Sequence, residues 1–260
     1  MWRKLKHYAG YLLDLDGTVY RGNEVIEEAK QFVAELQKRD VPYLFVTNNS
    51  SRTPEQFAEK LMAMGVYAEP HSVFTSSQAT AKYIQKNKLG KTVYMIGEIG
   101  LKTALENEGL KLVEDEAELV VMGIDRQINY EKFMSACLQV RSGATFIATN
   151  GDRALPSERG FLPGNGAFVS VVSTSTGVTP TFIGKPEATM LEEAMKLLGT
   201  TKDNTLMIGD NYDTDILAGI NSGIDTLLVY SGVTTKEQLA KKKVKPTYEL
   251  NSLAEWEFSD

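Results

Sequence analysis

Two aspartates separated by one residue carry the strongest chemical signal of the sequence. They lie in the run Asp14-Leu15-Asp16-Gly17-Thr18, directly after the apolar segment Tyr11-Leu12-Leu13, which we predict to be a strand. Open α/β sheets place their ligands at the carboxyl ends of strands. Two carboxylates at this spacing can divide the work, so that one attacks an electrophile and the other moves protons. An attack on phosphorus would form an aspartyl-phosphate, which water can hydrolyse.

A phosphate monoester is an anion, so a carboxylate can approach it only where cations are present. The run from Ile208 to Asp215 also follows an apolar segment and contains further acids. We expect Asp14, the main-chain carbonyl of Asp16 and Asp210 to supply hard oxygen ligands to Mg²⁺, with water and substrate phosphate completing the shell. Asp213 is expected to be the N-cap of a helix from Thr214. Asp215 is either a partner of the metal site or a first-turn acid favoured by the helix dipole.

Two further polar segments follow predicted strands. Thr47-Asn48-Asn49-Ser50 can bind phosphate oxygens through a hydroxyl, backbone N–H groups and an amide, or it can be a plain polar turn. Lys185, in Gly184-Lys185-Pro186, can neutralise an attacking carboxylate and the transferring phosphoryl group, or it can be an ordinary surface lysine.

The elements that must position these residues alternate between short apolar runs and segments of helical periodicity, which indicates βα units around a mostly parallel sheet. The alternation restarts near residue 91, where a second small α/β unit could begin, and the first style of alternation resumes near residue 181. A turn-rich stretch is expected at 150–166. We predict strands at 11–13, 41–46, 73–75, 92–96, 119–122, 145–148, 181–183, 205–208 and 226–229. We predict helices at 25–36, 54–64, from 100, and at 130–141, 167–173, 187–198 and 214–221.

The order of these motifs, D-x-D-G-T, T-N-N, G-K-P and G-D-x-x-x-x-D, resembles the haloacid dehalogenase-like (HAD) superfamily. The distance from Asn49 to Lys185 is similar to that of its type II members, the NagD-like and 4-nitrophenylphosphatase-like phosphatases, which carry a large α/β cap there. Further matches are Gly123-Ile124-Asp125 with Tyr130, the run 148–152, and Pro163-Gly164-Asn165-Gly166. Gly151 departs from the pattern, since relatives often have proline there.

The resemblance implies an α/β fold with a Rossmann-like parallel-sheet core, formed by residues 1–80 and 181–260, and an inserted smaller α/β cap at 81–180. It makes Asp14 the nucleophile and a metal ligand, Asp16 the general acid/base and a main-chain ligand, and Asp210 the third protein ligand. The resemblance also implies that phosphate is bound by Thr47, Asn48, Asn49 and Lys185. Lys185 would in addition balance charge, and Asp215 would orient Lys185 or a metal-bound water. On the cap, Asn150, Asp152 and Arg153 are the expected leaving-group contacts.

The implied activity is that of a hydrolase acting on phosphoric monoester bonds, a Mg²⁺-dependent phosphatase of sugar, nucleotide or aryl phosphates. Asp16 favours phosphate chemistry, because dehalogenases of the superfamily lack Asp at this position and the ion-pump ATPases have Thr. Two alternatives remain: a phosphotransferase of the same superfamily, and a phospho-accepting regulatory or binding module. Asp16 and the large cap argue against the regulatory module, which needs neither a proton shuttle nor a lid.

Composition limits the partners of this chain of 260 residues. The net charge of −6 disfavours a nucleic-acid surface, and no apolar run approaches the roughly 20 residues of a membrane span. The single cysteine, Cys137, allows no internal disulfide and fits a reducing cytoplasm; we expect it to pack in a helix. His7, His71 and the run Lys241–Lys243 are expected to have no catalytic role. The partner is then a small-molecule phosphate ester, and the oligomeric state stays open.

Overall fold

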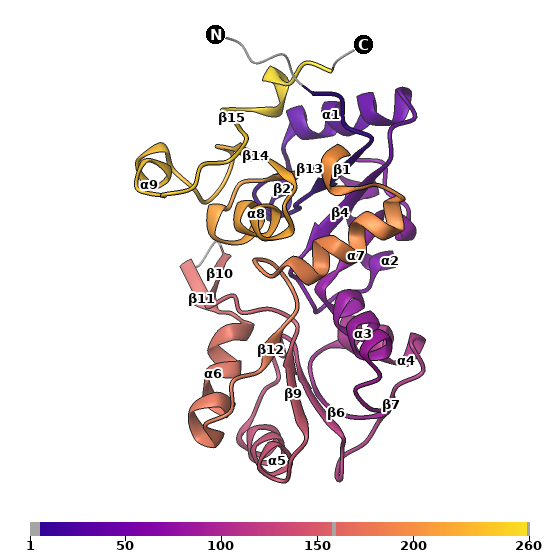
Figure 1. Cartoon of the computed structure of the whole chain (residues 1–260), viewed down its shortest axis with the longest axis vertical. Coiled ribbons are helices and arrows are strands. Elements are labelled where there is room, and N and C mark those ends of the chain that lie inside the picture. The colour runs from indigo at the N-terminus through magenta and orange to yellow at the C-terminus, as the bar shows by residue number, and fades with distance from the viewer. Residues whose placement is uncertain (1–5, 158–159, 259–260) are drawn as a thin grey trace. The chain divides into compact units, whose positions relative to one another are not determined.

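The computed structural model describes residues 6–157 and 160–258. The chain divides into two compact units, one formed by residues 1–47, 57–74 and 185–260 and the other by residues 48–56 and 75–184. Each unit contains its own sheet with helices beside it (Figure 1). The predicted α/β fold class is confirmed, since long helices and parallel strands make up both units.

The first unit contains a six-stranded sheet in which the motif-bearing strands are neighbours. The strand that directly precedes Asp14 lies near the centre of the sheet and is parallel to the strands on both sides of it. In order across the sheet, the strands are β15 (Tyr248–Leu250), β14 (Asp225–Val229), β13 (Thr205–Gly209), β1 (Gly10–Leu13), β4 (Tyr43–Thr47) and β5 (Val73–Thr75).

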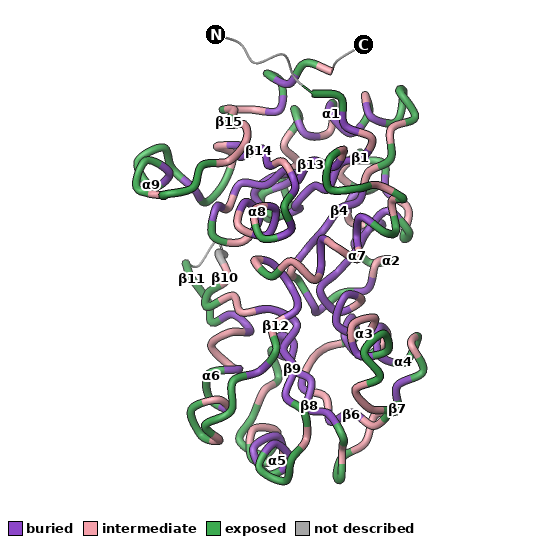
Figure 2. Tube along the Cα trace, viewed as in Figure 1, coloured by how far each residue is buried: buried purple, intermediate pink, exposed green. Residues whose placement is uncertain are grey.

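The central strands are mostly apolar because both faces of this sheet are covered. Successive side chains of a strand point to opposite faces. Leu13 accordingly joins one cluster with Phe45 and Ile208, to which α1 (Glu27–Lys38) contributes Phe32 and Leu36. On the opposite face α7 (Ala188–Leu198) packs against β4 and β1. Figure 2 shows that burial in this unit concentrates in the strands.

The other helices of the first unit follow the predicted pattern with some differences. α2 (Pro54–Ala63) buries Phe57 and Leu61, as predicted, together with Ala58, whereas Met64, also expected in this stripe, follows the helix and is half-buried. The helix expected at 214–221 is a π-helical turn over Tyr212–Ile216 followed by α8 (Leu217–Ser222). Not predicted were the short helix α9 (Lys236–Ala240), the strand β15 and the hairpin of β2 (Tyr20–Arg21) and β3 (Glu24–Val25).

The second unit has a five-stranded sheet with strand order β12-β9-β8-β6-β7. Its core joins residues of β8 and β9 to the apolar faces of two helices, and Cys137 packs there beside Val140, as predicted. The strands are β6 (Thr92–Ile96), β7 (Lys111–Leu112), β8 (Leu119–Met122), β9 (Thr145–Ala148) and β12 (Thr181–Phe182). The helices are α3 (Ser76–Asn87), α4 (Ile99–Asn107), α5 (Tyr130–Arg141) and α6 (Asn165–Thr176).

Three features of this unit differ from the predictions. The stretch expected to be rich in turns contains the antiparallel hairpin of β10 (Ala154–Ser157) and β11 (Gly160–Pro163). The unpredicted helix α3 begins at a capping box formed by Thr75 and Gln78. The strand predicted at 181–183 was grouped with the core. It is β12, which pairs with β9 and so belongs to the second sheet.

Within residues 6–157 and 160–258, no helix combines the length and the apolar character that crossing a bilayer requires. His7 and His71 are exposed, and Lys242 of the lysine run pairs with the exposed Asp213.

Candidate active site

Strand register brings the two principal acidic motifs to one edge of the first sheet. Leu13 of β1 pairs with Ile208 of β13, and the Asp14 N–H donates to the Ile208 carbonyl at 2.9 Å. The chain continues from these strands into Asp14 and Asp210. Carboxylate oxygens of Asp14, Asp210 and Asp215 all lie within 4.8 Å of one another, although Asp14 is about two hundred positions away in sequence.

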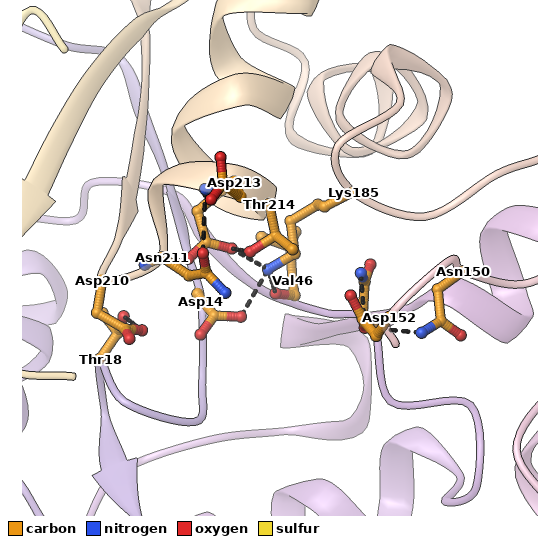
Figure 3. A network of polar contacts seen from close by, with 12 residues as sticks. Asp14, Thr18, Val46, Asn150, Asp152, Lys185, Asp210, Asn211, Asp213 and Thr214 are labelled. Carbon is orange, nitrogen blue, oxygen red and sulfur yellow. Dashed lines mark hydrogen bonds and ion pairs between the residues drawn. The ribbon is translucent and has the colours of Figure 1, made fainter. Parts of the chain in front are cut away.

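A buried lysine joins two of these carboxylates (Figure 3). Lys185 Nζ lies 2.5 Å from Asp14 Oδ1 and 2.7 Å from Asp215 Oδ1, and it donates to the Val46 carbonyl at 3.0 Å. Lys185 is only 1% exposed. Burial alone would lower the pKa of this ammonium, but the charges of the two carboxylates outweigh it and raise the pKa above its ordinary value. Lys185 therefore stays protonated beside Asp14.

The pKa of the Asp14 carboxyl is raised, whereas an ordinary salt bridge lowers the pKa of its acid. Burial raises its pKa well above the ordinary value, and the charge of Asp215 adds to this, while Lys185 opposes both. A buried acid in contact with a lysine and held beside like charges is typical of a functional site rather than of a stabilising ion pair.

Asp210 is held by groups from two loops. Thr18 Oγ1 donates to Asp210 Oδ1 at 3.0 Å, and the Val233 N–H donates to Asp210 Oδ2 at 2.7 Å. Burial, followed by the charge of Asp215, raises the pKa of Asp210 to about 6. Two glycines leave room for this carboxylate: a Cβ would stand 2.5 Å from its oxygens at Gly17, where φ is +99°, and 2.0 Å from one of them at Gly232.

The turn after β13 orients Asp215 into the site. Asn211, not Asp213, caps this turn, because Asn211 Oδ1 accepts from the Asp213 N–H at 3.0 Å. The predicted N-cap role of Asp213 is therefore wrong: the turn begins two residues earlier, and Asp213 pairs with Lys242 on the surface at 2.6 Å. The Asn211 N–H donates to Asp215 Oδ2 at 3.0 Å. Figure 3 shows Asn211, Asp213 and Thr214 together on this turn.

Asp16 stands apart from the buried cluster, with an exposed side chain after β1. It lies next to the β2–β3 hairpin, since it forms a bridge with Tyr20. Partial desolvation raises the pKa of its carboxyl, and the charge of Lys60 and the Gly22 N–H oppose the rise.

The donor set of the cluster fits a hard divalent cation. Three carboxylates offer oxygen ligands within 4.8 Å of one another, and Lys185 contacts those of Asp14 and Asp215. Burial raises the pKa values of Asp14 and Asp210, and the negative charge of Asp215 adds to both shifts. Carboxylate oxygens of this kind are what Mg²⁺ selects. A main-chain ligand from Asp16 stays a prediction.

The residues expected to bind phosphate continue from the end of β4. Thr47 is the last residue of that strand and is buried, and Asn48 and Asn49 follow it directly. Asn49 Oδ1 accepts from the N–H and the hydroxyl of Ser51, both at 2.9 Å. This arrangement fixes the Asn49 side chain as a turn-stabilising acceptor, and phosphate binding by the three residues stays a prediction.

The predicted leaving-group residues form a small polar network inside the second unit. Asp152 Oδ2 accepts from Asn48 Nδ2 at 3.1 Å and from Asn150 Nδ2 at 2.7 Å, and Figure 3 shows Asn150 and Asp152 facing each other. Asn150 Oδ1 also accepts from the Thr149 hydroxyl at 2.9 Å. These bonds hold the loop in shape; substrate contacts by Asn150, Asp152 and the exposed Arg153 stay predictions.

Sequence reasoning assigned no role to several groups that shape the site. Thr18 lies inside the D-x-D-G-T motif, so its position was a signal. Gly232 and Val233 carried no signal, because nothing in their local sequence marks a backbone donor to an aspartate that follows the neighbouring strand.

Comparison with known proteins agrees with this geometry. A model of the haloacid dehalogenase-like hydrolases matches residues 11–111, and a second HAD-hydrolase-like model matches residues 182–256. The 5'-nucleotidase YutF of Bacillus subtilis is 56% identical over 97% of this chain and 98% of its own. An acid sugar phosphatase of Staphylococcus saprophyticus is 52% identical over 96% and 97% of the two chains.

Solved structures give the same relationship. A thermostable p-nitrophenylphosphatase from Bacillus stearothermophilus superposes with a TM-score of 0.89 at 54% identity, over 98% of this chain and all of that one. NagD from Escherichia coli K-12 superposes with a TM-score of 0.91 at 29% identity, over 97% and 99% of the two chains.

Fold and site together define a hydrolase with paired acids at the carboxyl edge of a parallel sheet. The chain belongs to the haloacid dehalogenase-like hydrolases, in the group that contains NagD and the 4-nitrophenylphosphatases. The predicted family and the predicted enzyme class are thus confirmed.

Proposed function

We propose that this protein is a Mg²⁺-dependent phosphatase that hydrolyses small phosphomonoesters through an aspartyl-phosphate on Asp14. The observation that carries the proposal is the contact of the buried Asp14 carboxylate with Lys185, beside Asp210 and Asp215. A nucleophilic carboxylate needs fixed positive charge if it is to meet a phosphate anion. Lys185 supplies this charge on an ammonium that neighbouring carboxylates keep protonated.

In the first half-reaction, a carboxylate oxygen of Asp14 attacks phosphorus and the ester P–O bond breaks. Asp16 donates a proton to the departing alkoxide, so that an alcohol leaves. The exposed position of the Asp16 side chain suits this role, because it lies outside the charge cluster and can approach a leaving group.

In the second half-reaction, water attacks the phosphorus of the acyl phosphate. Asp16, now a carboxylate, accepts the proton of that water, and the Asp14 carboxylate leaves with inorganic phosphate as the product. Lys185 remains paired with Asp14 and Asp215 and balances charge in both half-reactions.

Asp14, Asp210 and the Asp16 main-chain carbonyl would hold Mg²⁺, which when bound supplies Lewis-acid charge to the phosphate oxygens. Asp215 would orient Lys185, an assignment supported by its 2.7 Å contact with Nζ. Thr47, Asn48, Asn49 and Lys185 would bind the phosphate oxygens.

Residues 81–180, which lie within the second unit, would act as a cap that selects the leaving group and excludes water. The names of relatives, a 5'-nucleotidase, an acid sugar phosphatase and a p-nitrophenylphosphatase, support nucleotide, sugar and aryl phosphates as the substrate class. The single buried, unpaired cysteine supports a reducing, cytoplasmic setting.

The proposal is tested by Asp14→Asn with Asp213→Asn as its matched control, since Asp213 is an exposed acid of the same loop system that pairs only on the surface. With 4-nitrophenyl phosphate and Mg²⁺, D14N should lose at least about 10³-fold in kcat, whereas D213N keeps normal activity. Chelation of Mg²⁺ should abolish turnover reversibly. Normal Mg²⁺-dependent hydrolysis by D14N would refute the mechanism.

Two product measurements separate the alternatives. A phosphotransferase would convert part of the released phosphate into a new ester when acceptor alcohols are added. A phospho-accepting module would keep the label on Asp14 and release phosphate slowly. Equal amounts of alcohol and inorganic phosphate, released rapidly with and without acceptor, are expected for the phosphatase.

A further inference from the structure

The side chain of Asp16 is positioned by a hairpin that follows its motif. The chain turns back after Asp16, so that the Gly17 N–H donates to the Tyr20 carbonyl at 2.7 Å and Asp16 forms a bridge with Tyr20. Tyr20 begins the β2–β3 hairpin, in which it pairs with Val25. The turn of this hairpin contains Gly22, whose φ of +58° lies in the left-handed region that favours glycine.

Gly22 connects Asp16 to a lysine of another helix. Its carbonyl accepts from Lys60 Nζ at 2.8 Å. Its N–H, after the charge of Lys60, opposes the rise that burial causes in the pKa of the Asp16 carboxyl. Both contacts involve the backbone of Gly22. A shift of the Gly22 carbonyl, which Lys60 holds, would therefore also move the Gly22 N–H relative to the Asp16 carboxyl.

Lys60 has a second contact with the same hairpin. Its ammonium lies 3.6 Å from the ring centroid of Tyr20, well within the range of a cation–π interaction. Tyr20 is only 3% exposed, so the ring provides a fixed surface. Lys60 is located on α2, one position before the buried Leu61, and its half-buried stem anchors it to the first unit.

The other side of the hairpin is anchored independently. Arg21 Nε donates to the Ser231 carbonyl at 2.7 Å, and Ser231 Oγ donates to the Gly17 carbonyl at 2.6 Å. The hairpin should therefore remain folded when Lys60 is replaced, and only the placement of the Gly22 peptide should loosen.

We propose that Lys60 is a positioning residue for the proton transfer of Asp16: by holding Gly22 and Tyr20 it fixes the Asp16 carboxyl where a leaving group departs. The inference rests on the proposed phosphatase function. Lys60 itself donates no proton to the substrate; the proton that reaches the leaving oxygen comes from Asp16.

This role gives a readout that a purely structural role would not change. A 4-nitrophenolate is a good leaving group and needs little protonation, whereas the alkoxide of an alkyl phosphate such as glycerol phosphate needs a proton as it departs. Misplacing Asp16 should therefore slow alkyl ester cleavage much more than aryl ester cleavage.

The experiment measures kcat and KM of Lys60→Met and Lys60→Arg on both esters at saturating Mg²⁺. Because hydrolysis of the acyl phosphate is common to both esters, the comparison uses kcat/KM, which reports the half-reaction in which the leaving group departs. We expect K60M to lose about 10-fold or more in kcat/KM on glycerol phosphate and less than about 3-fold on 4-nitrophenyl phosphate. K60R should recover most of the activity, because a guanidinium can donate to Gly22 and stack on Tyr20. Lys30→Met, on the neighbouring helix α1, is the control and should affect neither ester.

An equal loss on the two esters, or no loss on either, would overturn the inference. If K60M does not fold, Lys60→Gln, which keeps a donor but removes the charge, is measured in the same way. In the Asp16→Asn background, K60M should add no further selective loss on glycerol phosphate, and an undiminished selective loss there would also overturn the inference. A wild-type enzyme that hydrolyses neither ester would instead refute the phosphatase proposal, so the two failures are distinguishable.

Discussion

Replacing Lys185 by methionine tests how far the buried cluster depends on this one cation. Methionine keeps the length and apolar stem of the side chain and removes only the ammonium. Coulomb's law with an effective dielectric constant of about 20 gives roughly 6 kcal/mol for each of the contacts at 2.5 and 2.7 Å. The cost of burying the ammonium cancels much of this attraction, and removal of one partner from a buried ion pair destabilises proteins by about 3–5 kcal/mol.

Urea unfolding of K185M in the presence of a chelator measures this loss. We expect the midpoint of the first unit's transition to fall by about 1 M or more. Lys242→Met is the matched control, because Lys242 pairs with the exposed Asp213 at a similar distance of 2.6 Å, where the loss should be under about 1 kcal/mol.

The pH dependence of the loss has a defined sign. Burial raises the folded-state pKa of Asp14, and without Lys185 that pKa should rise further. An acid whose pKa is higher in the folded state than in the unfolded state stabilises the fold when protonated and loses this contribution as pH rises through the folded pKa. The deficit of K185M should therefore grow between pH 5 and pH 8. Equal stability of K185M and K242M, or a deficit that shrinks over this range, would refute the reasoning.

Two further predictions concern the glycine beside Asp210 and a salt bridge of the first sheet. Gly17→Ala should raise the Mg²⁺ concentration needed for half-maximal activity by about 10-fold or more, since its Cβ would lie 2.5 Å from the Asp210 carboxylate. Gly143→Ala is the control, because Gly143 has a similar φ of +103° and open space around it. This control should lose only about 1–2 kcal/mol of stability through backbone strain and should keep normal Mg²⁺ dependence. For Asp225, burial raises the pKa, but hydrogen bonds, first from Lys6, lower it overall. Asp225→Asn should therefore cost about 1 kcal/mol at pH 7, and the deficit should shrink as pH falls below 3.8 through the folded-state pKa, as urea unfolding across this range would measure. A Mg²⁺ dependence unchanged in G17A, or a D225N deficit independent of pH, would contradict these expectations.

The sequence by itself determined the elements that carry the motifs. β1 and β13 are short runs of apolar residues buried on both faces, and the stripe of Phe32 and Leu36 on α1 has the spacing of a helix that packs on a sheet. Because parallel strands end at the same edge, the position of Asp14 and Asp210 after such strands already indicated one shared site. Local pattern was sufficient for these features.

The local sequence was less informative where structure depends on pairing or on the geometry of one turn. The side chains of β11 are exposed, and the hairpin β10–β11 has no alternation of apolar and polar residues, so its pairing could not be read from periodicity. The cap of the turn before α8 is Asn211 rather than Asp213, because a π-helical turn begins earlier than an ordinary helix would. Both residue types are good N-caps, and the backbone decided between them.

Only the tertiary structure determined how the charges of the site balance. Lys185 is one of 28 basic residues, and apart from the order of the motifs nothing in its neighbouring residues distinguishes it from a surface lysine. Its burial between Asp14 and Asp215 follows from the meeting of three segments that are distant in the chain. The same holds for Lys60, whose contacts with Gly22 and Tyr20 join α2 to the hairpin beside Asp16. A sequence motif specifies which groups can react, and three-dimensional packing specifies which charges they meet, because electrostatic interactions depend on distance and burial rather than on order along the chain.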